Sequence, residues 1–185
     1  FQDTLFDHLM EKRIEHILLI CSTYDAFILE EDGRINEAIF QEYVSLNLRY
    51  PPRFIKAHSA EKALEILEND RVDLVINMLS ISDQNPFEFS KVIKRRFANI
   101  PVVVLTPFSR EVSQRLAVQD LSGVDYVFSW LGNTNLLLAI IKLIEDKMNT
   151  DFDVGEVGVQ CILLVEDSVR YYSSYLPNMY RIVIE

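Results

Sequence analysis

Two neighbouring acids, Glu166 and Asp167, follow a run of large aliphatic residues at positions 162–165, Ile-Leu-Leu-Val. Adjacent carboxylates at the end of a buried strand offer the oxygen ligands that a hard divalent cation prefers. The same pair also has a purely structural interpretation, in which the strand end is solvated and Asp167 caps the next helix. Both interpretations place a short apolar strand directly before the acids.

Nearly the same segment occurs at an earlier point in the sequence. Residues 16–23 read His-Ile-Leu-Leu-Ile-Cys-Ser-Thr, and residues 161–168 read Cys-Ile-Leu-Leu-Val-Glu-Asp-Ser. Aligning the two aliphatic runs places Cys21 opposite Glu166 and Ser22 opposite Asp167. The sequence therefore contains an internal repeat, in which one copy carries two acids and the other carries none.

An aliphatic run that ends in paired acids and is followed by Ser and a helix resembles the opening of a response-regulator receiver domain. In that family the acids bind a divalent metal, beside an aspartate on the third strand that accepts a phosphoryl group from a histidine kinase. The resemblance implies an α/β fold of the flavodoxin-like kind, with a doubly wound, five-stranded parallel sheet. It also implies that Glu166 and Asp167 would bind Mg²⁺ if the second receiver is complete.

Alternating apolar and amphipathic stretches fit this fold over residues 1–149, because strands that alternate with helices indicate a parallel sheet covered on both faces. We expect strands at about 15–22, 54–58, 72–79, 100–106 and 123–130. We expect helices between and after them, at about 35–48, 59–67, 86–95, 109–121 and 133–147. An additional amphipathic helix is predicted before the first strand, over residues 2–13.

The rest of the chain is predicted to be a linker over 150–159 and then the first strand and helix of a second receiver, truncated, over 160–185. Residues 168–177 resemble, less specifically, receivers attached to phosphoenolpyruvate synthase-like multidomain proteins. A single apolar strand at 161–166 would be prone to aggregation without a partner. We therefore expect this extension to pack on the first domain or on a second copy, which would give a homodimer.

The acid-pair and phosphoacceptor positions of the first copy hold residues that cannot perform receiver chemistry. Cys21 and Ser22 stand at the acid-pair positions, and neither is a good ligand for Mg²⁺. Met78 stands at the phosphoacceptor position, and its thioether cannot form an acyl phosphate. A shift of one residue would bring Asn77 to that position, and an amide is equally inert as a nucleophile.

The remaining receiver positions are only partly retained. The position of the charge-neutralising lysine falls on Ser129 or Trp130. Thr106 matches the switch Thr or Ser, although a Thr at a strand end is also an ordinary residue. We expect Tyr24, Tyr126 and Trp130 to fill the space that metal and phosphate would occupy.

The first domain is therefore predicted to be a pseudo-receiver that is not an enzyme and holds no cofactor. It would act by binding other protein domains of a bacterial signalling protein, through the surface of its fourth helix, fifth strand and fifth helix. Two alternatives stay open. One is a phosphoryl acceptor with an atypical site at Asp25 or Asp83, and the other is a small-ligand sensor with a pocket near Ser22, Met78 and Thr106.

Composition restricts the partners and the location. The formal net charge of −10 disfavours a nucleic-acid surface, and the basic run at 91–96 is predicted to be the solvated side of a helix. Cys21 and Cys161 lack metal-ligand or redox spacing, so we expect them to be reduced and buried in a cytoplasmic protein. No apolar stretch has the length of a membrane span, and no glycine-rich phosphate loop follows a strand.

Overall fold

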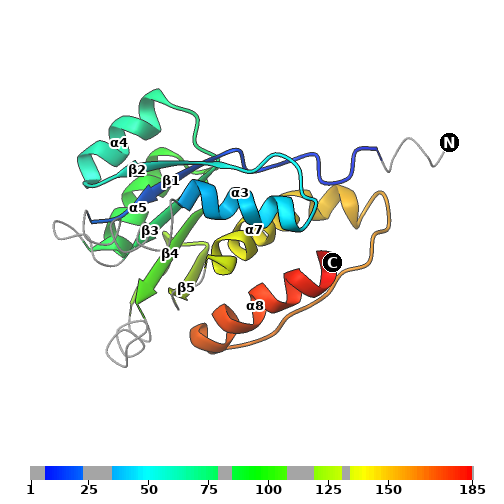
Figure 1. Ribbon diagram of the computed structural model, residues 1–185. Helices are drawn as coiled ribbons and strands as arrows, with labels where there is room; N and C mark the ends of the chain where they lie inside the picture. The colour runs from blue at the N-terminus through cyan, green and yellow to red at the C-terminus, as the bar shows by residue number, and fades with distance from the viewer. Residues whose placement is uncertain (1–6, 23–34, 79–84, 108–118, 131–133, 185) are drawn as a thin grey trace.

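The centre of the protein is a five-stranded parallel sheet with the strand order β2-β1-β3-β4-β5 (Figure 1). The computed structural model describes residues 7–22, 35–78, 85–107, 119–130 and 134–184. The strands are β1 (His16–Ile20), β2 (Arg53–Ala57), β3 (Leu74–Met78), β4 (Val102–Pro107) and β5 (Tyr126–Trp130). The helices are α3 (Ile35–Ser45), α4 (Ala60–Asn69), α5 (Pro86–Arg96), α7 (Asn135–Asp153) and α8 (Val169–Ile184).

The central strands are apolar along nearly their whole length, because helices cover both faces of the sheet. Residues 17–20 of β1 and all five residues of β3 are buried. In the register, Ile17 pairs with Phe54 of β2 and with Leu74 of β3. The predicted doubly wound parallel sheet is therefore confirmed, with the strand bounds shifted by only a few residues.

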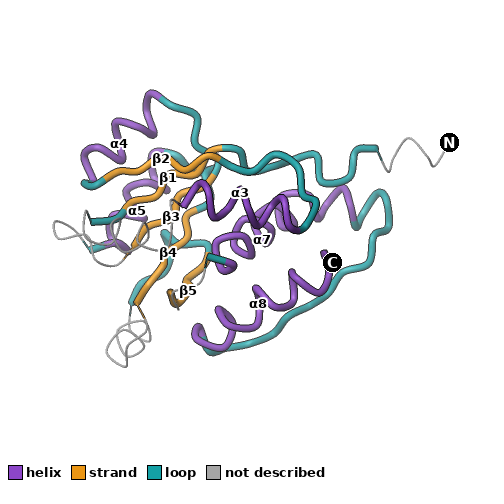
Figure 2. Tube along the Cα trace, viewed as in Figure 1, coloured by secondary structure: helices purple, strands orange, loops and turns teal. Residues whose placement is uncertain are grey.

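Two separate apolar clusters lie on the two faces of the sheet. Figure 2 shows the helices that surround the sheet. One cluster joins the sheet to α3 and α7, and includes Ile39 and Ile140. The other joins the sheet to α4 and α5, and includes Ile66 and Ile93. Most of the helix expected at 109–121 lies outside the described residues.

Gly123 lies where the backbone approaches α5 before β5 begins. A Cβ at this position would stand 2.6 Å from the backbone nitrogen of Lys91 and 2.7 Å from its Cα atom. We expect Gly123→Ala to lower the free energy of unfolding by about 1–3 kcal/mol, since backbone atoms cannot rotate away from the clash. Urea unfolding monitored by Trp130 fluorescence measures this change, and Ser122→Ala, an exposed neighbour, is the control. Equal stability of the two variants would contradict the close approach.

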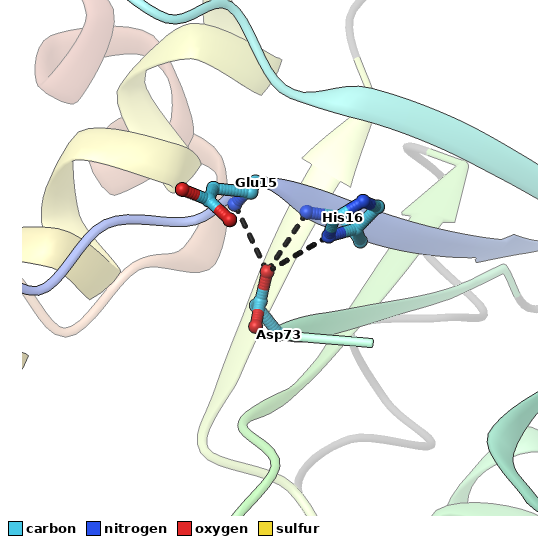
Figure 3. Close-up of side chains that lie close together, drawn as sticks. All are labelled: Glu15, His16 and Asp73. Carbon is cyan, nitrogen blue, oxygen red and sulfur yellow. Dashed lines mark hydrogen bonds and ion pairs between the residues drawn. The ribbon is translucent and has the colours of Figure 1, made fainter. Parts of the chain in front are cut away.

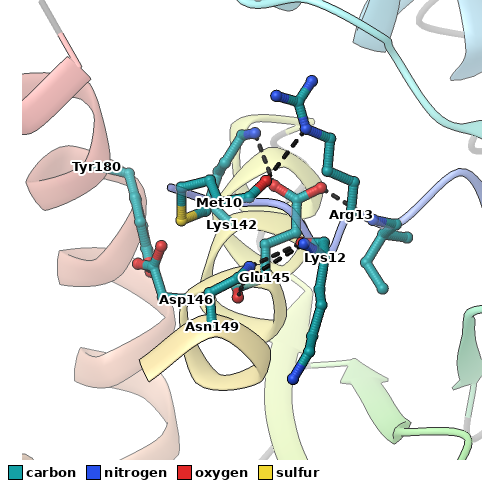
Figure 4. A network of polar contacts seen from close by, with 9 residues as sticks. Met10, Lys12, Arg13, Lys142, Glu145, Asp146, Asn149 and Tyr180 are labelled. Carbon is teal, nitrogen blue, oxygen red and sulfur yellow. Dashed lines mark hydrogen bonds and ion pairs between the residues drawn. The ribbon is translucent and has the colours of Figure 1, made fainter. Parts of the chain in front are cut away.

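The N-terminal helix predicted over 2–13 is wrong for its described part, because residues 7–10 form a turn and 11–15 are not helical. The backbone N–H groups of alternate residues instead donate to side chains one helical turn apart on α7. Figure 4 shows Lys12 beside Asn149 of this helix. The contacts are Met10 N to Asp153 Oδ2 (3.3 Å), Lys12 N to Asn149 Oδ1 (2.9 Å) and Ile14 N to Glu145 Oε1 (3.0 Å). Two extended residues span about 6.7 Å and four helical residues rise about 6 Å, so the two spacings match.

The extension after residue 149 also differs from the prediction. Residues 150–153 belong to α7 and are not part of a linker. Residues 161–166 have no strand partner among the described residues and do not form the predicted strand, because a strand needs a neighbour for its backbone groups. Helix α8 is present, and it packs on β5 and α7 of the first domain.

None of the described helices is both long and apolar enough to cross a membrane.

Candidate functional site

The candidate site lies at the carboxyl edge of the sheet, where the parallel strands end together. Cys21 follows β1, Met78 ends β3, and Thr106 and Ser129 lie near the ends of β4 and β5. Strand pairing places Met78 opposite Leu105 and Thr106 opposite Ser129. The fold therefore brings the predicted receiver positions to one edge, as the resemblance implies.

Met78 is packed into the interior at this edge. Its side chain is only 6% exposed and belongs to the same apolar cluster as Cys21, Leu105 and Phe128. A thioether supplies no nucleophile for a phosphoryl group, and it is a poor ligand for Mg²⁺. The predicted phosphoacceptor position thus holds a core residue.

Cys21 and Ser22 stand beside Met78 without offering carboxylate oxygens. Cys21 is a fully buried free cysteine, whose N–H donates to the carbonyl of Ala57 (3.1 Å). Its own carbonyl lies 3.2 Å from Nδ1 of His58. Ser22 is partly buried. These contacts fix the end of β1, and neither residue at the predicted acid-pair positions carries a carboxylate.

Asn77 has a structural role one residue before Met78. Its Nδ2 atom donates to the carbonyl of Pro86 (3.0 Å) and to Oγ of Ser90 (3.2 Å), which fastens the start of α5 to β3. Its Oδ1 atom is buried and has no hydrogen-bond partner among the described residues. The alternative register, with Asn77 in the site, is not supported, because its amide is bound to α5.

Thr106 and Ser129 are buried, and Ser173 of the C-terminal extension contacts Ser129. The N–H of Ser129 donates to Oγ of Ser173 on α8 (2.8 Å), and that hydroxyl donates to the carbonyl of Val169 (2.6 Å). Sequence reasoning missed Ser173, since nothing in the sequence links a helical Ser to a strand 44 residues earlier. Tyr126 and Trp130 are partly buried against the same apolar cluster.

Helix α8 covers the outer side of β5 and part of α7. Tyr172 stacks on Phe128 with ring centroids 5.6 Å apart, and Leu176 is buried. Tyr180 donates a 2.5 Å hydrogen bond to Oδ2 of Asp146 on α7. Burial raises the pKa of Asp146, and the bond from Tyr180 acts in the opposite direction. The β5 and α7 part of the expected docking surface is therefore occupied by the chain itself.

The metal ligands expected in the second copy lie at the start of α8. Glu166 accepts a hydrogen bond at Oε1 from the N–H of Ser168 (2.9 Å), and Asp167 is exposed. The predicted cap at Asp167 is wrong, because Ser168 directly precedes α8 and its Oγ atom accepts from the N–H of Tyr171 (3.5 Å). Cys161 is exposed, so its predicted burial is wrong, because the strand that would bury it is not formed.

One group of metal-ligating side chains occurs elsewhere among the described residues, at the amino edge of the sheet (Figure 3). Oδ2 of Asp73 accepts from the N–H groups of Glu15 (3.0 Å) and His16 (2.9 Å). Arg71 pairs with Glu15 Oε2 (2.7 Å) and with Asp73 Oδ1 (3.1 Å), and Asp73 is the main cause of the raised pKa of Arg71. These carboxylates already join the starts of β1 and β3, so the group is best explained as structural.

The basic run on α5 is paired with acids. Lys91 bonds to Asp120 (2.9 Å), Lys94 bonds to Asp125 (2.6 Å), and Arg96 contacts Glu68. The hydrogen bond from Lys91 is the first cause that lowers the pKa of Asp120 to about 2. The cations of this run are therefore matched by carboxylates from neighbouring segments.

Comparison with known proteins supports the receiver fold. No family model matches the chain. The heme response regulator HssR of Staphylococcus saprophyticus is 29% identical over 156 residues, which cover 82% of this chain and 66% of that relative's own length. Because part of the relative lies outside the matched region, the similarity does not assign the activity of the whole relative to this chain.

Solved receiver structures share the same architecture. A CheY-like receiver domain protein from Methanospirillum hungatei has a TM-score of 0.54 and 18% identity, and covers 75% of this chain and 98% of its own. The receiver domain of AraT from Geobacillus stearothermophilus has a TM-score of 0.52 and 19% identity, with 75% and 98% covered. The signal receiver domain of an HD domain-containing protein from Pseudomonas fluorescens has a TM-score of 0.51 and 18% identity, with 76% and 93% covered. The strand order and these similarities together show that this chain has the fold of a CheY-like response-regulator receiver domain.

Proposed function

We propose that this receiver domain does not accept a phosphoryl group and acts by binding protein domains within a two-component-type signalling protein. The observation that carries the proposal is Met78, a buried thioether at the end of β3 where the phosphoacceptor would stand. No carboxylate occupies the neighbouring positions 21 and 22. Without metal ligands and a nucleophile, phosphoryl transfer lacks both its charge neutralisation and its acceptor.

The setting of the domain is part of the same proposal. The name of the curated relative, a heme response regulator, supports a two-component context. The net charge of −10 and the ion-paired basic run support protein partners over nucleic acid. We propose other domains of the same signalling protein as the partners and the cytoplasm as the location. Mg²⁺ would belong to a complete second receiver and not to this domain.

The alternatives receive less support. Asp25 and Asp83, which could form an atypical acceptor site, lie outside the described residues, as does Tyr24. A small-ligand pocket near Ser22, Met78 and Thr106 is disfavoured because Met78 and Thr106 are almost wholly covered by protein atoms. Binding of protein partners needs neither feature.

Incubation with acetyl phosphate and Mg²⁺, followed by intact-mass measurement, tests the proposal. We expect no phosphoryl adduct on the protein, while a receiver with the complete acid set is modified under the same conditions. Stoichiometric phosphorylation would contradict the proposal. In that case Asp25→Asn and Asp83→Asn, each measured alone, would identify the acceptor, because only the variant that lacks the acceptor would lose the adduct.

A further inference from the structure

Helix α8 has two separate apolar faces. One face, with Tyr172, Leu176 and Tyr180, lies against β5 and α7. The other face consists of Tyr171, Tyr175 and Ile182, which are 50%, 47% and 77% exposed. At about 100° of rotation per residue, these three exposed side chains fall within about 40° of one another and roughly 120° from the buried face.

A helix that packs on only one partner typically has a single apolar face, with polar residues on the rest of its surface. The stacked rings of Tyr171 and Tyr175, with centroids 6.0 Å apart, present a flat apolar surface to solvent. The polar residues of α8 gather in a third sector, which contains Arg170, Ser174 and Arg181. The apolar surface of α8 is thus about twice as wide as the part of it that contacts the first domain.

The segment before α8 is exposed in the same way. Ile162, Leu163 and Val165 are 67%, 86% and 82% exposed. Their counterparts in the first copy, Ile17, Leu18 and Ile20, are 0% exposed. The same aliphatic pattern is therefore fully buried in one copy and largely exposed in the other.

The first copy shows which surroundings suit this pattern. There the run lies in β1, with parallel strands β2 and β3 on its two edges and helices on both faces. A second copy of this protein is a less suitable cover, since each copy carries a charge of −10 and Glu166 and Asp167 adjoin the segment. A parallel sheet of the kind that surrounds β1 would bury the run without bringing two such acidic pairs together.

We propose that residues 161–166 are the first strand of a second parallel sheet, whose other strands come from residues that follow α8 in the natural protein, and that α8 is shared between the two sheets. The face with Tyr172, Leu176 and Tyr180 stays on β5 and α7, and the face with Tyr171, Tyr175 and Ile182 packs on the second sheet. Because Ser173 bonds to Ser129, the shared helix joins the second domain to the degenerate site of the first.

Amide hydrogen exchange tests the proposal. The natural reading frame is expressed past codon 185, and the exchange of amides 162–165 is compared between that product and the 185-residue protein. We expect unprotected exchange in the shorter protein and exchange that is at least about 100-fold slower in the longer one. A frame that encodes no further strands, or equally fast exchange in both proteins, would overturn the proposal. Protection that appears in the 185-residue protein as its concentration rises would also overturn it, in favour of a second copy.

Variants on the two faces of α8 separate its two roles. Tyr175→Glu is expected to leave the unfolding midpoint of the 185-residue protein within about 2 °C, because the side chain is half exposed there. The same change should remove most of the protection of amides 162–165 in the longer protein. Leu176→Ala, on the face that packs on β5 and α7, should leave that protection in place. The reverse pattern would show that the faces are wrongly assigned.

Discussion

Met78→Asp is expected to lower the free energy of unfolding by about 3–5 kcal/mol at pH 7, because it places a carboxylate among apolar side chains. The site around Met78 contains Cys21, Leu105 and Phe128, none of which can pair with a negative charge. Burial should raise the pKa of the new carboxyl above its unfolded value of about 3.9. The ionisation penalty is therefore absent below that unfolded pKa and grows as the pH rises towards the folded pKa.

Urea unfolding at pH 4 and pH 7 measures the effect of Met78→Asp, and Met78→Leu is the matched control. Leucine keeps the volume and the apolar character, so we expect a cost of less than about 1.5 kcal/mol at both pH values. The aspartate variant should also stay unmodified by acetyl phosphate, because Cys21 and Ser22 supply no metal ligands. An aspartate variant as stable as the leucine variant at pH 7 would show that the site is open to solvent.

Glu145→Ala is expected to cost about 2–4 kcal/mol, because it leaves a buried N–H group and a partly buried lysine without their partner. Oε1 of Glu145 accepts from the N–H of Ile14 (3.0 Å), and Oε2 pairs with Nζ of Lys142 (2.7 Å). Both Ile14 and Glu145 are almost fully buried. The loss should release the N-terminal segment from α7 (Figure 4).

Two control variants separate the contributions of Glu145. Glu145→Gln keeps a side-chain acceptor for Ile14 and loses only the ion pair, so we expect it to cost roughly half as much as Glu145→Ala. Glu65→Ala breaks a pair of the same sequence spacing, Lys62 with Glu65 at 2.9 Å, that is exposed to solvent. It should cost less than about 0.5 kcal/mol. Equal losses for Glu65→Ala and Glu145→Ala, measured by urea unfolding, would show that burial does not strengthen the N-terminal contact.

Much of the fold could be predicted because its signals are local. Runs such as Val102–Leu105 are too apolar for any place except a strand covered on both faces, and short helical stretches separate them. The candidate site could be predicted as well, because the carboxyl ends of parallel strands must lie at one edge. The residue types at those ends carry the prediction that this domain does not accept a phosphoryl group.

The parts that could not be predicted depend on partners far away in the sequence. Residues 7–13 have an amphipathic pattern that is also typical of a helix, but Met10, Lys12 and Ile14 bond to side chains more than 130 residues later. The pattern of residues 161–166 predicts a strand, and no described segment lies beside it to accept its backbone groups. Hydrophobic periodicity indicates which residues can be buried together, but it does not indicate which other part of the protein covers them.

The sequence by itself determined the parallel receiver sheet and the absence of carboxylates at positions 21, 22 and 78, since both follow from residue type and order along the chain. The tertiary structure decided that Met78 is enclosed in the core, that the N-terminal segment is extended along α7, and that α8 covers β5. Each of these outcomes is set by distant groups that satisfy buried polar atoms or cover apolar surface. Such pairings exist only once the protein has folded.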